Sequence, residues 1–217
     1  ILSLLLHSSY FLILGNIYNR GDITITYPVF RGLAPVFVTI FSVVFLNDYI
    51  TFKGYLGISI VVFGLLLLAK ENYKNKLNLK LLIISIFVSI LIALYTFTDG
   101  AGVRSTKNEF TFIVWNFFLG GWITISYVYL TQKNDLFKLR TKQLSLITVA
   151  SFMSFIAYGI IIWSMNHQPI AYVSSIRESS IIMTSLISFI FLGEKIKFIR
   201  ILSAVIFFIG VYFIFNS

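Results

Sequence analysis

The feature that most constrains this chain is a series of long apolar segments separated by short polar links. Each segment has about 17–23 residues, the length that an α-helix needs to cross the roughly 30 Å hydrocarbon core of a bilayer. The segments do not alternate apolar and polar residues, as the strands of a membrane barrel must. The sequence therefore predicts an all-α integral membrane protein with eight transmembrane helices. They are placed at 1–18, 26–46, 53–69, 79–98, 110–130, 144–165, 170–192 and 198–215.

The composition supports a membrane protein over a soluble one. Hydrophobic residues make up 58% of the chain and charged residues only 12%, and a soluble domain could not keep so much apolar surface from water. The net charge of +9 is spread over short clusters between apolar runs, which is typical of membrane-protein loops and not of a nucleic-acid-binding surface. There is no cysteine, and His7 and His167 lie far apart, so no metal site and no cofactor are expected.

The basic residues also bear on orientation. Lysine and arginine number 12 in one set of alternate links and 3 in the other set. The positive-inside rule places the richer set in the cytoplasm and the C-terminus on the opposite side.

An internal repeat appears when the chain is shifted by 146 residues. Comparison of 26–64 with 172–210 needs no gap and gives nine identities, among them Arg31 with Arg177 and Gly64 with Gly210. The acids Asp48 and Glu194 coincide as well, each just after a predicted helix. Internal repeats of this kind are characteristic of secondary transporters.

The repeat also predicts the domain organisation. A complete second copy with five helices occupies 78–217, whereas 1–70 corresponds only to its last three helices, at 147–216. We therefore expect a ten-helix protein that is incomplete at its N-terminus, with a natural eight-helix variant as the alternative. Five is an odd number of helices, so the two copies must have opposite orientations in the membrane, as in an inverted-repeat transporter.

Several motifs resemble the EamA-type branch of the drug/metabolite transporter (DMT) superfamily. Each predicted repeat ends with a short turn and a glycine-containing helix, and shorter phrases are similar too, although Asn47–Asp48 replaces the usual Gly–Glu. The motifs are "FLNDYITFKGYLGISIVVFGLLLL" (45–68), "FLGEKIKFIRILSAVIFFIGVYFI" (191–214), "YPVFRGLAP" (27–35), "DGAGVR" (99–104) and "AYVSSIRESS" (171–180). The resemblance implies two five-helix repeats, transport of small metabolites, cytoplasmic termini and a multi-pass location in the cell (inner) membrane.

The candidate site begins with charges inside the predicted helices. An ionised side chain in a bilayer costs several kcal/mol and usually faces a cavity or a partner. Arg31 and Arg177 occupy equivalent positions of the repeat, Glu178 is an acid predicted within a helix, and Asp99 is an acid at the predicted end of another. We expect both arginines to reach a central cavity and to favour an anionic or zwitterionic ligand. Two alternatives are that the arginines extend to the membrane interface, or that Arg177 forms a structural pair with Glu178 or Asp99.

Other polar and aromatic residues of these helices complete the prediction. The full set of expected substrate-binding residues is Arg31, Arg177, Glu178, Asp99, Tyr95, Trp115, Asn116, Ser174 and Trp163.

The predicted function is a secondary transporter, more specifically an exporter, that works by alternating access and without covalent chemistry. We expect it to act as a monomer or a homodimer, with a small-molecule substrate and the lipid bilayer as its partners. Proton coupling is a further hypothesis, with Glu178 as the first carrier and Asp99 as the second. The alternatives are a structural or assembly subunit of a membrane complex and, as a lesser candidate, a membrane-embedded enzyme, for which the helices hold no nucleophile–base pair or histidine cluster.

Overall fold

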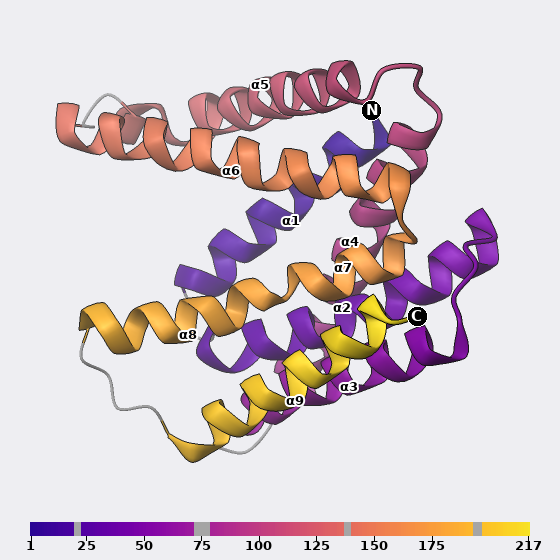
Figure 1. Cartoon of the computed structure of the whole chain (residues 1–217). Helices are drawn as coiled ribbons and strands as arrows, with labels where there is room; N and C mark the ends of the chain where they lie inside the picture. The colour runs from indigo at the N-terminus through magenta and orange to yellow at the C-terminus, as the bar shows by residue number, and fades with distance from the viewer. Residues whose placement is uncertain (20–22, 72–78, 137–139, 193–196) are drawn as a thin grey trace.

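A computed structural model describes residues 1–19, 23–71, 79–136, 140–192 and 197–217, and these residues form α-helices without any strand. The helices diverge from a common region in which α4 and α7 lie among the others (Figure 1). They are α1 (Leu2–Asn19), α2 (Ile23–Leu46), α3 (Phe52–Glu71), α4 (Leu79–Arg104), α5 (Glu109–Leu136), α6 (Thr141–His167), α7 (Ile170–Arg177), α8 (Ser179–Leu192) and α9 (Phe198–Phe215).

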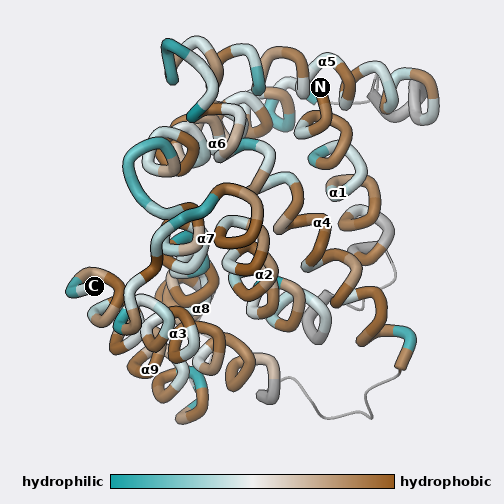
Figure 2. Tube along the Cα trace, turned by 90° about the vertical axis from the view of Figure 1, so that its right-hand side faces the viewer, coloured by the Kyte–Doolittle hydropathy of each residue, from teal (hydrophilic) through white to brown (hydrophobic). Residues whose placement is uncertain are grey.

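The described helices have the length and hydropathy of membrane spans. Seven segments are long and apolar enough to cross a bilayer, with α7 and α8 together forming one of them, and α1 contains a shorter apolar stretch, Leu2–Gly15. Most of the helical length is hydrophobic, and hydrophilic residues gather near the links (Figure 2). Large apolar side chains such as Leu130 and Phe45 are exposed, which suits a surface that faces lipid.

The predicted helix at 170–192 is wrong in one respect, because it is broken at Glu178. Helix α7 ends at Arg177 and α8 begins at Ser179, and Glu178 has φ −68° and ψ −8°. Its N–H donates to Ser175 O at 3.3 Å. This is the i→i−3 pattern of a 3₁₀ turn, which is wound more tightly than the i→i−4 pattern of an α-helix. Helix α2, which the sequence predicts to be the equivalent of this segment, is continuous even though it contains Pro28 and Pro35.

Helix α4 is longer than predicted and positions the candidate site. The sequence placed its end at residue 98, but the helix continues to Arg104 and so carries Asp99 within it. It packs mainly against α1 and α2, and also contacts α5, α6 and α7. Tyr95, Thr96 and Asp99 are buried on this helix, so three polar side chains lie within two turns of one another.

The most extensive contact in the described structure joins α3 and α9, and glycines make it close. A Cβ atom on Gly57 would lie 2.8 Å from Gly210 O, and one on Gly64 would lie 3.1 Å from Ser203 O. As the residue number rises along α3, the number of the facing residue on α9 falls. The two helices are therefore antiparallel, and Ser203 and Gly210 stand 146 residues after Gly57 and Gly64.

Candidate functional site

The centre of the candidate site is Glu178, which is fully buried between two arginines. Its Oε2 lies 2.9 Å from Arg31 Nε, and its Oε1 lies 3.3 Å from Arg177 Nε. The Arg31 and Arg177 side chains are only 12% and 6% exposed. The structure thus brings together three of the predicted residues, from α2, α7 and the break between α7 and α8.

The other contacts of the two arginines do not use all of their N–H donors. Arg31 donates from Nη2 to Ser180 Oγ at 3.1 Å, and Arg177 donates from Nη1 to Thr96 Oγ1 at 3.1 Å. Four buried side-chain atoms have no hydrogen-bond partner in the described structure. Arg31 Nε and Glu178 Oε2 face each other as an ion pair, whereas Arg177 Nη2 and Ser174 Oγ have no such partner. A buried donor without an acceptor destabilises the folded protein, so a ligand that supplies an acceptor here would bind favourably.

A second polar cluster surrounds Asp99, which is also fully buried. Its carboxylate accepts hydrogen bonds from Tyr158 OH at 2.6 Å and Asn116 Nδ2 at 3.2 Å, and from Ser3 Oγ. His7 Nε2 lies 2.9 Å from Asp99 Oδ2. Four donors from α1, α5 and α6 therefore converge on one carboxylate of α4. The predicted residues Asp99 and Asn116 meet here, away from the arginines.

Tyr95 lies between the two clusters. Its ring stacks on the His7 imidazole with centroids 4.1 Å apart, and Arg177 Cζ lies 5.9 Å from its centroid. A cation near an aromatic face is stabilised by the ring quadrupole. Tyr95 thus contacts both the arginine cluster and the Asp99 cluster. A change of charge in one cluster therefore alters the electrostatic potential at the other.

Two predicted residues lie elsewhere. Trp115 is 55% exposed and packs edge-on against Phe118 on the outside of α5. Trp163 is 51% exposed and lines a separate cavity of about 650 Å³ between α5 and α6, together with Lys107 and Glu109. Neither tryptophan has a contact with the charged clusters among the described interactions.

Sequence reasoning missed four contributors: Ser3, His7, Thr96 and Ser180. His7 was set aside because it has no histidine at ligand spacing. A signal was nevertheless present, since Ser3 and His7 are four residues apart and share one face of α1. The other two, Thr96 and Ser180, have no distinguishing spacing in the sequences of their helices.

Asp48, which lies just after a predicted helix, is largely buried in the structure. Its side chain is only 9% exposed, and its Oδ1 pairs with Arg104 Nη1 at 2.6 Å. Its Oδ2 accepts a hydrogen bond from Ile170 N at 2.9 Å, so it caps the first turn of α7. Arg104 also donates to Met165 O and Gln168 O, which ties the end of α4 to the α6–α7 link. Glu194, its counterpart in the repeat, lies outside the described residues.

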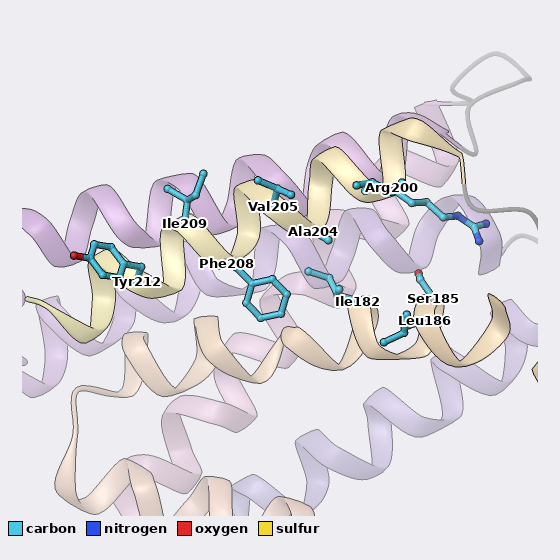
Figure 3. A pocket seen from close by; sticks show the side chains of 10 residues that line it. Ile182, Ser185, Leu186, Arg200, Ala204, Val205, Phe208, Ile209 and Tyr212 are labelled. Carbon is cyan, nitrogen blue, oxygen red and sulfur yellow. The ribbon is translucent and has the colours of Figure 1, made fainter. Parts of the chain in front are cut away.

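One groove lies away from both clusters. It lies between α8 and α9, has a volume of about 560 Å³ and is lined mainly by apolar side chains such as Phe208, Val205 and Leu186, with Arg200 at one end (Figure 3). Its walls offer few polar groups for recognising a metabolite. The site is therefore assigned to the buried charges and not to this groove.

Long apolar helices with charged side chains paired between them define a multi-pass, all-α integral membrane protein of the transporter type. Residues 79–216 match the EamA-like transporter family, which is more than half of the chain, and the chain belongs to that family in the DMT superfamily. It is also 33% identical over 101 residues to a protein of Archaeoglobus fulgidus described as an uncharacterized transporter. That match covers 46% of this chain and 34% of the relative, so it spans about a third of the relative's length. The family points to a transporter rather than an enzyme.

Proposed function

We propose that the protein is a secondary transporter that moves small anionic or zwitterionic metabolites by alternating access. The observation that carries this proposal is the buried cluster of Arg31, Glu178 and Arg177, in which two cations share one anion. The cluster has a net positive charge and keeps a free donor, Arg177 Nη2. A substrate carboxylate would complete it, because a guanidinium binds carboxylates through two parallel hydrogen bonds.

In the proposed binding step, the substrate carboxylate competes with Glu178 for the guanidinium groups. Arg177 Nη2 and Ser174 Oγ donate to the ligand, and neither atom has another partner to give up in the described structure. Glu178 sits at the break between α7 and α8, so loss of its bonds frees the two helix segments to change their angle. This links occupancy of the site to a change of conformation.

The two-repeat organisation, with 1–70 as part of one copy and 78–217 as the other, is part of the proposal. The antiparallel α3–α9 contact supports it, because Gly57 faces Gly210 and Gly64 faces Ser203. Contacts of this reciprocal kind are expected where a two-fold axis relates two copies. The Asp48–Arg104 pair, which holds α7 against the end of α4, is then a contact that closes one end of the pathway.

Export across the cell membrane is the direction and location that we propose, on the basis of the family resemblance. An exporter of this kind would release metabolites that accumulate inside the cell. Uptake into right-side-out vesicles, compared with inside-out vesicles, distinguishes the two directions.

The proposed substrate class is tested by counterflow in liposomes of phosphatidylethanolamine and phosphatidylglycerol that contain the full-length protein. A panel of amino acids and carboxylates identifies a transported probe. Arg31→Gln and Arg177→Gln should each reduce exchange of that probe by on the order of tenfold or more, since a hydrogen bond to a charged group contributes roughly 1.5–3 kcal/mol. Lys53→Gln is the control for loss of a positive charge. Unchanged exchange in the Arg31/Arg177 double variant would refute the assignment.

A further inference from the structure

We infer that His7, Asp99 and Tyr158 form a proton-binding site that is separate from the arginine cluster and is coupled to it through Tyr95. This inference rests on the proposed transport function, to which it adds a coupling ion and the residue that exchanges it. The sequence analysis considered Glu178 and Asp99 as proton carriers, but the geometry points to the imidazole of His7.

The cluster is built to hold an ionised carboxylate beside an imidazole. Tyr158, Asn116 and Ser3 all donate to Asp99, so among its described partners His7 is the one whose charge can change. Imidazole is the side chain whose unperturbed titration falls between about pH 5 and 8. A proton that binds to His7 forms an ion pair with the carboxylate oxygen 2.9 Å away.

Access separates the roles of the two residues. The His7 side chain is 19% exposed, whereas that of Asp99 is fully buried. In this proposal the exposed edge of the imidazole meets water, and the buried carboxylate behind it stabilises the charged form. Exchange at His7 needs no opening of the core, which suits a group that must load and release a proton in every cycle.

Glu178 is a less suitable carrier. It lies between Arg31 Nε at 2.9 Å and Arg177 Nε at 3.3 Å, so a proton on its carboxyl group would leave two buried guanidinium groups without an anion. Its position suits it to holding the two arginines and not to exchanging a proton.

A metal ion is also less suitable than a proton. Mg²⁺ and Ca²⁺ are bound through several oxygen ligands, whereas the groups around Asp99 include an imidazole nitrogen and an amide nitrogen that donate to it. Among the residues that the structure describes, no group of three His, Asp or Glu side chains could hold a metal ion.

Tyr95 supplies the coupling. His7 and Arg177 approach its ring, and their charged groups are at most about 10 Å apart. A protonated His7 and Arg177 repel each other, and an anionic substrate on Arg177 removes part of that repulsion. Proton and anion therefore favour each other's binding. The transported unit carries less net charge than the anion alone, so an anion leaving down its own concentration gradient takes a proton with it.

The groups that face His7 come from four helices. Asp99 and Tyr95 lie on α4 and Tyr158 on α6, while Phe11, on α1 itself, stacks at 6.4 Å. Arg177 of α7 lies behind Tyr95. Asp99 is the anion and Arg177 the cation nearest to the imidazole among the described contacts, so these two determine how readily His7 is protonated.

The test is a histidine NMR titration of the full-length protein in phosphatidylcholine bilayers. The sequence given contains two histidines, so His167→Gln leaves His7 as the reporter among these residues. In that background, Asp99→Asn should lower the midpoint of the His7 titration by more than about one pH unit, because it removes the adjacent anion. Arg177→Gln should raise the midpoint by about one pH unit, from a charge about 10 Å away at an effective dielectric constant near 20.

Glu109→Gln is the matched control for loss of a carboxylate, and it should leave the midpoint unchanged. Arg177→Gln lies outside the Asp99 cluster and tests the coupling even if Asp99→Asn does not fold. The inference is overturned if His7 does not titrate, if Arg177→Gln leaves its midpoint unchanged, or if exchange of K⁺ for Na⁺ shifts the His7 signals at constant pH. The measurement needs no substrate, so failure of the counterflow assay and failure of this inference are distinguishable.

Discussion

The pair between Arg31 and Glu178 gives the sharpest test of the site, because it joins residues 147 positions apart in different helices. A double-mutant cycle with Arg31→Gln, Glu178→Gln and the combined variant measures their coupling free energy. Their nearest atoms are 2.9 Å apart and both side chains are largely buried. With charge centres roughly 4 Å apart, the attraction at an effective dielectric constant of 20 is about 4 kcal/mol.

The individual changes should differ in size. Glu178→Gln leaves both arginines without an anion and should reduce the free energy of unfolding by about 3–5 kcal/mol. Arg31→Gln should cost less, because Glu178 keeps its bond to Arg177 at 3.3 Å. Since Arg177 shares the carboxylate, we expect a coupling free energy of about 2–4 kcal/mol between Arg31 and Glu178.

The assay is reversible unfolding of the full-length protein by SDS in mixed micelles, followed by tryptophan fluorescence. The pair between Glu109 and His167 is the internal control. It is longer, at 3.6 Å, and its side chains are 25% and 48% exposed, so its coupling should stay below about 0.5 kcal/mol. If the Arg31 and Glu178 effects add to within about 0.5 kcal/mol, the two side chains do not pair and the reasoning fails.

Three further predictions concern packing, closure and orientation. Gly210→Val should lower the free energy of unfolding by about 1–3 kcal/mol, because its Cβ would lie 2.7 Å from a carbonyl oxygen of α3. Gly121→Ala is the control: a Cβ there has nothing within 4 Å, so the free energy of unfolding in SDS should not fall. Arg104→Gln removes the ion pair with Asp48 and should open the end of the pathway that α7 closes. A single cysteine at the buried position Ser175 should then react several-fold faster with a membrane-impermeant thiol reagent. Equal rates would mean that the Asp48–Arg104 pair does not close the pathway. A fluorescent protein that matures only in the cytoplasm, fused to the C-terminus, should stay dark according to the basic-residue count. A bright fusion would favour the orientation implied by the family resemblance.

Much of the fold could be predicted because membrane helices are encoded locally. Lipid requires each spanning segment to satisfy its own backbone hydrogen bonds, so an apolar run of sufficient length is enough to identify a helix. The helix ends were less predictable. Helix α4 continues through Thr98, Asp99 and Gly100, which the hydropathy pattern assigned to its end.

The break at Glu178 could not be predicted from propensity or hydropathy, because the segment 170–192 contains no proline or glycine after residue 169. It depends on a buried glutamate whose partners come from two helices. The sequence did single out Arg31, Arg177 and Glu178, since charges are rare in apolar segments. It could not distinguish Asn116, which reaches Asp99, from Trp115 beside it, which faces outward.

The sequence by itself determined the class of protein, the helical segments and the charged residues within them, and it predicts the equivalence of positions 146 apart. These properties depend on hydropathy and on residue identity, which can be read along the chain. The tertiary structure decided which charges meet. It paired Glu178 with both arginines, gave Asp99 to His7 and Tyr158, and placed Tyr95 between the two groups. Those pairings depend on the rotation and crossing of helices distant in sequence, which are set by side-chain packing and have no local signal.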